Sequence, residues 1–194
     1  MRAAPNEWEI GMSSWIIQDG NYGDFETGQI CEFALELYSD NFQSVAIKQK
    51  TFKKIGAARY EVIGKVIYLA SEVFVLDFGV RTYQESKPPE GITIGSFVAA
   101  EIYLGIDSFS YFERLYKLQG MPPLIYTWKI SSIAQQTAPF IESRDSSGRK
   151  VLMRDERKLA YKIITKTDAW NDDDGMAEYI FTYTPADAPA TQTL

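Results

Sequence analysis

Histidine is absent from all 194 residues of this chain, and this sets the first limit on its chemistry. Without an imidazole, Ser–His and Cys–His nucleophile pairs, HExxH metal sites and histidine acid–base catalysis are excluded. The single cysteine, Cys31, excludes an intrachain disulfide and a zinc site of paired cysteines. The patterns GxxxxGK[ST], GxGxxG and GxSxG are absent as well. We therefore expect no cofactor, and binding is favoured over catalysis, although enzymatic activity stays open.

Residues 168–175, DAWNDDDG, form the densest group of candidate ligands. An EF-hand loop with Gly175 at its sixth position fails, because Trp170 and Phe181 would occupy two ligand positions. Three interpretations stay open: a polar hairpin turn, a looser Mg²⁺ or Ca²⁺ site, and an aromatic anchor rimmed by carboxylates. We assign no metal ligands. The candidate partner-binding residues are Trp170, Asp172, Asp173 and Asp174.

Three further carboxylates lie on or beside predicted strands, at Asp77, Glu101 and Asp107. A glycosidase-type hydrolase needs two carboxylates at a set separation across a cleft. The sequence does not fix that separation. A hydrolase that uses these carboxylates, or the aspartate cluster with a metal ion, is therefore kept as an alternative function.

Basic residues gather in a separate segment. Residues 41–66 contain six basic residues and one acidic residue, although the whole chain has a net charge of −6. This candidate basic patch comprises Lys48, Lys50, Lys53, Lys54 and Arg59. Backed by Phe52 and Tyr60, the patch would suit contact with nucleic acid, and the alternative is a solvated loop. Since phosphate neutralisation supplies most non-specific affinity, the overall acidity disfavours nucleic acid without excluding it.

Alternating apolar residues predict that strands position these side chains. A single short helix is expected near 110–119, where Ser110 and Glu113 have capping-box spacing and Gly120 ends the pattern. The dipeptide Asp174–Gly175 predicts a hairpin turn before a final strand. Residues 40–57 and 81–91 are expected to be connections. The other strands are predicted at 7–18, 28–39, 60–70, 72–79, 92–104, 124–133 and 160–168.

These elements predict a mostly β fold, an antiparallel β-barrel or a sandwich. A weak likeness between the segments that follow Gly28 and Gly95 leaves open two half-units of the OB or SH3-like kind. We expect one β-rich domain over 1–185, with 1–87 and 88–185 as its two sub-units if the chain divides. Residues 186–194 are expected to form a frayed tail.

No run reaches the roughly 18 apolar residues that a membrane helix needs, and the first residues lack the apolar core of a signal peptide. We expect a cytoplasmic protein with no membrane contact; the oligomeric state stays open. The leading interpretation is a protein-binding module, for instance an immunity or inhibitor protein that engages a basic partner. The alternatives are an OB-like oligonucleotide or oligosaccharide binder and the carboxylate- or metal-dependent hydrolase.

Overall fold

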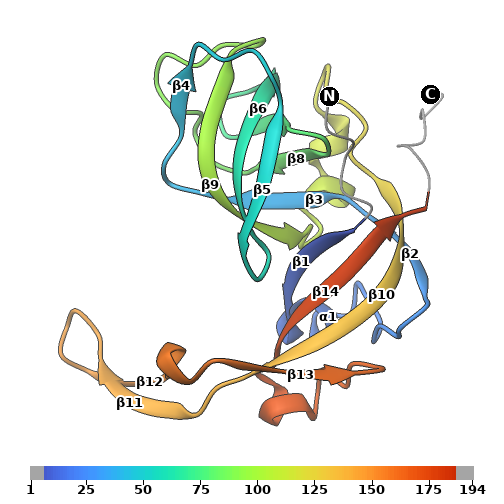
Figure 1. The fold of residues 1–194 in the computed structure, drawn as a ribbon, viewed down its shortest axis with the longest axis vertical. Coiled ribbons are helices and arrows are strands. Elements are labelled where there is room, and N and C mark those ends of the chain that lie inside the picture. Colours follow the sequence, from blue (N-terminus) through green and yellow to red (C-terminus); the bar gives the residue numbers. More distant parts are fainter. Residues whose placement is uncertain (1–6, 187–194) are drawn as a thin grey trace.

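The computed structural model describes residues 7–186 and confirms a mostly β fold with a closed five-stranded barrel (Figure 1). Around the barrel the strands follow the order β3, β9, β6, β7 and β8, and β8 returns to β3. Every neighbouring pair is antiparallel except β3 and β8, where Glu36 lies beside Tyr83 in parallel register. The barrel strands are β3 (Leu35–Tyr38), β6 (Arg59–Leu69), β7 (Phe74–Asp77), β8 (Arg81–Gln84) and β9 (Phe97–Ile106).

Strict alternation along β6 explains how this strand forms the barrel wall. Tyr60, Val62 and Val66 are buried inside, whereas Glu61 and Lys65 face outward. Strand β6 pairs with β5 over residues 59–63, with β9 over residues 59–65 and with β7 over residues 65–69, and a register shift between Val66 and Tyr68 lies within the pairing with β7.

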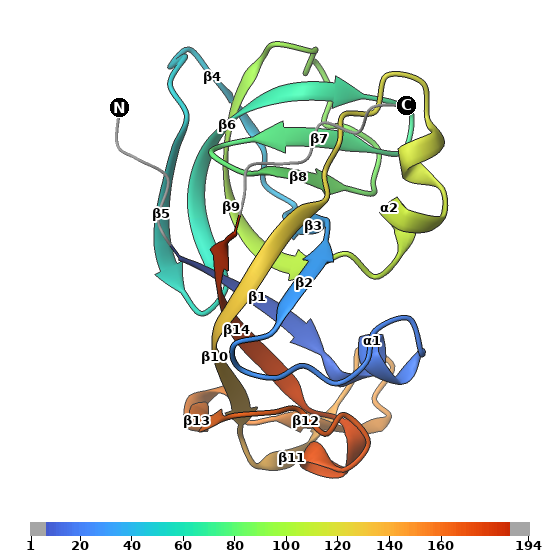
Figure 2. The same ribbon diagram turned by 90° about the vertical axis from the view of Figure 1, so that its right-hand side faces the viewer.

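A second set of strands continues from the barrel toward the other end of the molecule (Figure 2). Strand β2 runs through Ala34 directly into β3, and β1 meets the end of β9 at Gly11 and Gly105. One apolar core extends through both parts and includes Trp8, Trp128 and Phe181. This second set consists of β1 (Trp8–Ser13), β2 (Ile30–Phe33), β10 (Tyr126–Thr137), β13 (Ala160–Ile164) and β14 (Glu178–Pro185).

The helix expected near 110–119 is present but shorter, and the described residues contain a second short α-helix elsewhere. Helix α2 (Ser110–Glu113) ends early and is followed by the 3₁₀ turn η1 (Leu115–Lys117), and the segment covers the outer face of β7 and β8. Ser110 is not the cap, because Phe109 precedes the helix with φ +87° and the Asp107 carboxylate accepts a hydrogen bond from the Tyr111 amide. Helix α1 (Ser14–Gln18) occupies the end of the strand predicted at 7–18.

Two expected connections contain strands. Within 40–57 lie β4 (Gln43–Val45), which pairs with β9, and β5 (Thr51–Gly56), which pairs with β6. Within 81–91 lies β8. Strands β11 (Phe140–Arg144) and β12 (Lys150–Arg154), followed by the 3₁₀ turn η2 (Glu156–Lys158), form a hairpin that the sequence did not indicate.

The hairpin predicted at Asp174–Gly175 is wrong. Strands β13 and β14 do not pair with each other; they lie on opposite sides of β10. After β13 the chain pairs instead with residues 24–27, through the Thr27 amide on Thr165 and the Thr167 amide on Phe25. The 3₁₀ turn η3 (Asp172–Gly175) then leads back to β14.

No helix in residues 7–186 has the length and apolar character needed to span a membrane. Strands from both sides of residue 87 contribute to the barrel, and the number of folding units stays a prediction. Apart from Ala186, the tail expected at 186–194 lies outside the described residues.

Candidate functional site

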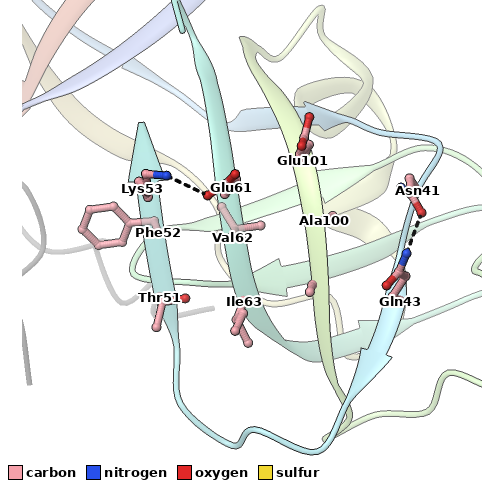
Figure 3. A pocket seen from close by; sticks show the side chains of 11 residues that line it. Asn41, Gln43, Thr51, Phe52, Lys53, Glu61, Val62, Ile63, Ala100 and Glu101 are labelled. Atoms are coloured by element: carbon pink, nitrogen blue, oxygen red, sulfur yellow. Dashed lines mark hydrogen bonds and ion pairs between the residues drawn. The ribbon is translucent and has the colours of Figure 1, made fainter. Parts of the chain in front are cut away.

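A hollow of about 530 Å³ lies on the outer face of the barrel, over β4, β9, β6 and β5 (Figure 3). Two rows of outward side chains cross these strands. In one row Lys53 lies beside Glu61, which lies beside Glu101. The neighbouring row consists of Thr51, Ile63, Ala99 and Gln43.

The charges in this hollow are unequal. Lys53 Nζ lies 3.2 Å from a Glu61 carboxylate oxygen, so one ion pair forms within the row. Glu101 stands directly opposite Glu61 across the β6–β9 pair and makes no ion pair among residues 7–186. Two like charges directly opposite each other destabilise a sheet, because they repel each other. The hollow therefore has one carboxylate that its own lysine does not neutralise.

The rim of the hollow adds polar groups without charge. Asn41 and Gln43 come from the segment that leads into β4, and the Gln43 amide donates to Asn41 Oδ1 at 3.4 Å (Figure 3). Ile63 and Ala99 supply an apolar strip between the carboxylates and these amides. Such a mixture suits the stem and the charged head of a long side chain.

The basic patch does not form an open cationic surface. Lys50 pairs with Asp77 at 2.6 Å, Lys53 with Glu61, and Lys54 with Glu9. The Arg59 guanidinium carbon lies 5.8 Å from the centroid of the Tyr103 ring. Lys48 is exposed. The fold thus brings carboxylates from three other strands to the lysines that the sequence grouped together.

The aspartate cluster is largely engaged within the chain. An Asp172 carboxylate oxygen accepts hydrogen bonds from the Asp168 amide at 2.9 Å and the Tyr179 hydroxyl at 2.8 Å. Asp173 forms an ion pair with Arg154. Asp174 belongs to the left-handed turn, with φ +55°, and Trp170 is 67% exposed. Of the four candidate partner-binding residues, Trp170 and Asp174 are thus exposed, whereas Asp172 and Asp173 contact other residues of the chain.

The three strand carboxylates do not converge on a common cleft. Glu101 lines the barrel hollow, whereas Asp77 pairs with Lys50 and does not line it. Asp107 is fully buried, bonds the Tyr83 hydroxyl, and leaves its Oδ2 without a partner among the described residues. Burial raises the pKa of Asp107. No group of three acidic or sulfur ligands suited to a metal occurs in residues 7–186.

Another carboxylate lies near Asp107 in the barrel wall. Glu36 accepts a hydrogen bond from the Tyr38 hydroxyl at 2.8 Å. Burial raises the pKa of Glu36 to about 7, and the charge of Asp107 adds to the effect.

The single thiol of the chain is half-buried. Burial raises the pKa of the Cys31 thiol to about 12, so this thiol is protonated at neutral pH.

Sequence reasoning singled out Glu101 but missed Glu61, Asn41 and Gln43, which complete the hollow. These residues show no spacing pattern along the chain, because the register of the strands brings them together. The alternation of Glu61 and Ile63 with buried residues was the local signal that both side chains point outward.

Comparisons with protein-family models, curated proteins and solved structures found no match to this chain.

Proposed function

We propose that this chain is a protein-binding module whose barrel hollow receives a cationic side chain of a partner protein. One observation carries the proposal: Glu61 and Glu101 oppose each other across β6 and β9, and within residues 7–186 only Glu61 has a lysine partner. A cation placed between the two carboxylates would remove their repulsion. Binding would then relieve the repulsion between the two carboxylates that is present in the free protein.

Arginine fits this position better than lysine. Its planar guanidinium presents several N–H groups and can bond two carboxylates at once. Its stem would lie along Ile63 and Ala99, which separate the carboxylates from the Asn41 and Gln43 amides. Because the hollow is open to solvent, the ion pairs would contribute about 0.2–1 kcal/mol each. Specificity for a basic segment, rather than high affinity, is the expected contribution of this site.

An inhibitor or immunity protein that engages a basic partner remains our proposal for the biological class. The free Cys31 thiol fits a reducing compartment such as the cytoplasm. An oligonucleotide binder is less well supported, because three lysines of the basic patch already have carboxylate partners. A hydrolase is less well supported, because neither Asp77 nor Asp172 lines the hollow that contains Glu101.

The test is a titration of the isotope-labelled protein with tri-arginine, followed by amide chemical shifts. We expect shifts concentrated in β4, β5, β6 and β9, and much smaller shifts with tri-citrulline, which has the same shape without the charge. Glu101→Gln should remove most of the response. Glu90→Gln is the matched control, since Glu90 is exposed on a barrel loop and does not line the hollow. Equal shifts with both peptides, or an unchanged response in Glu101→Gln, would overturn the proposal.

A further inference from the structure

We propose that residues 138–164, here called the arm, dock against the remainder of a second copy of this chain, here called the body. The arm contains the β11–β12 hairpin, the turn η2 and strand β13. In Figure 1 the hairpin stands away from the body at the lower end of the molecule. This surface is distinct from the barrel hollow, so the inference does not depend on the proposed function.

The hairpin receives little support from its own chain. Among residues 7–186, β11 and β12 pair only with each other and join no other strand. The main anchor is Arg154 at the base, which pairs with Asp173, donates to the Met176 carbonyl at 2.7 Å and lies 4.9 Å over the Phe140 ring. An isolated two-stranded hairpin is at best marginally stable in water, so its further stabilisation must come from elsewhere.

The tip of the hairpin nevertheless has a well-defined turn. An Asp145 carboxylate oxygen accepts hydrogen bonds from the amides of Ser147 and Arg149, at 2.8 and 3.0 Å. Gly148 takes the left-handed conformation, with φ +82°, that closes the turn. The local sequence thus specifies a hairpin, and a partner would meet a preformed surface rather than a segment that must first be ordered.

Apolar side chains are exposed on both faces of the hairpin. Val151 and Met153 point to one side of the hairpin and Leu152 points to the other, and all three are exposed. Leu152 is 70% exposed. A hairpin that served only its own core would bury one of these faces. The pattern therefore indicates a surface that is covered by something outside the single chain.

Strand β13 extends the same surface along an open sheet edge. It pairs with β10 on one side only, and its Ile163 side chain is 70% exposed. An apolar edge strand invites pairing with another chain. The arm as a whole contains seven of the eighteen large apolar side chains that are exposed in residues 7–186: Phe140, Val151, Leu152, Met153, Leu159, Tyr161 and Ile163.

The net charges of the arm and the body favour arm–body contact over arm–arm contact between two copies. The arm has seven basic and four acidic residues, a net charge of +3. The whole chain has −6, which leaves −9 for the body. Two arms would repel each other, whereas an arm and a body attract. The sequence thus contains, in one chain, an apolar basic surface and an acidic surface that complements it.

Sedimentation velocity over a wide concentration range tests the docking. We expect the mass to rise from that of one chain toward that of two or more, and the association to weaken at high salt. Leu152→Lys should weaken association about tenfold or more, because it places a charge in the apolar contact. Ile94→Lys is the matched control, since Ile94 is exposed to a similar extent but lies on a barrel loop. A monomer at every concentration, or equal effects of both variants, would overturn the proposal.

Mixing separates arm–body docking from arm–arm pairing. The Leu152→Lys variant has a damaged arm but an intact body, so wild-type arms should still bind it. Fluorescence-detected sedimentation of labelled Leu152→Lys with excess unlabelled wild type should show a mixed complex of intermediate affinity. If the labelled variant stays monomeric beside an associating wild type, the arms pair with each other and the proposal is wrong. Circular dichroism of each variant establishes that its fold is intact.

Discussion

The barrel and the arm are both built from β-strands but bury their apolar side chains differently. In β6 every second residue is buried, and the residues between are exposed or half-buried. In β12 four of the five residues are exposed, including three consecutive apolar ones. Alternation is therefore the sign of a strand with one buried face, and β12 lacks it because neither of its faces is buried. The barrel closes on itself and completes its own core; the arm ends in solvent and leaves its apolar surface uncovered.

The largest expected difference between the two regions concerns the truncation of a leucine. Leu104→Ala, at a fully buried position of β9, should lower the free energy of unfolding by about 2–5 kcal/mol, because it removes packing contacts and leaves a cavity. Leu152→Ala in the arm should change it by less than about 0.5 kcal/mol. Urea unfolding at low protein concentration measures both values. Similar losses at the two sites would contradict the view that the arm is uncovered.

A buried carboxylate gives the barrel a pH dependence that the arm should lack. The folded state raises the pKa of Glu36 to about 7, so between its ordinary pKa and 7 the folded chain binds more protons than the unfolded chain. The stabilising contribution is present below the ordinary pKa and is lost as the pH rises through 7. Glu36→Gln should remove most of this decline, on the order of 2–3 kcal/mol between pH 5 and 8.

Thermal unfolding across this pH range, with Glu32→Gln as control, checks the prediction. Glu32 is an exposed carboxylate on the neighbouring strand β2. Burial also raises the pKa of Asp107, so the pH dependence due to Asp107 should be unchanged by Glu36→Gln. An identical pH profile in wild type and Glu36→Gln would contradict the prediction, because it would show that ionisation of Glu36 does not lower the free energy of unfolding.

A smaller effect is expected where the barrel joins the strands that lead to the arm. A Cβ added at Gly11 would lie 1.6 Å from the Tyr103 hydroxyl oxygen, so the tyrosine ring must move. Gly11→Ala should cost about 1–3 kcal/mol of stability, as other overpacking changes do. Gly23→Ala, where nothing lies within 4 Å of the added Cβ, is the control. Tyr103→Phe should recover part of the loss in Gly11→Ala, and no recovery would contradict the proposed clash.

The sequence predicted the self-contained region better than the exposed one. Alternation located β6, β7 and β9, because a strand with one buried face has a period of two. It missed β5 and β12, where lysines and exposed apolar residues break that period. It also placed a hairpin at Asp174–Gly175, since turn chemistry is local, whereas the pairing of β13 and β14 with β10 is not.

The candidate sites show the same difference between local sequence patterns and long-range strand pairing. Glu101 was singled out as a strand carboxylate, but its neighbour Glu61 follows from the β6–β9 register, which no local pattern reveals. Lys50 and Lys54 were grouped by sequence, and their carboxylate partners Asp77 and Glu9 come from distant strands. Long-range pairing thus determines which charges remain available to a partner.

Hydrogen exchange of backbone amides at low and high protein concentration tests the central claim most directly. If the arm docks on a second copy, amides in β11, β12 and β13 should gain protection as concentration rises, while those in β6 and β9 stay equally protected throughout. The gain should be lost in Leu152→Lys. Arm amides that exchange at the same rate at every concentration would contradict the claim that a second copy covers this surface.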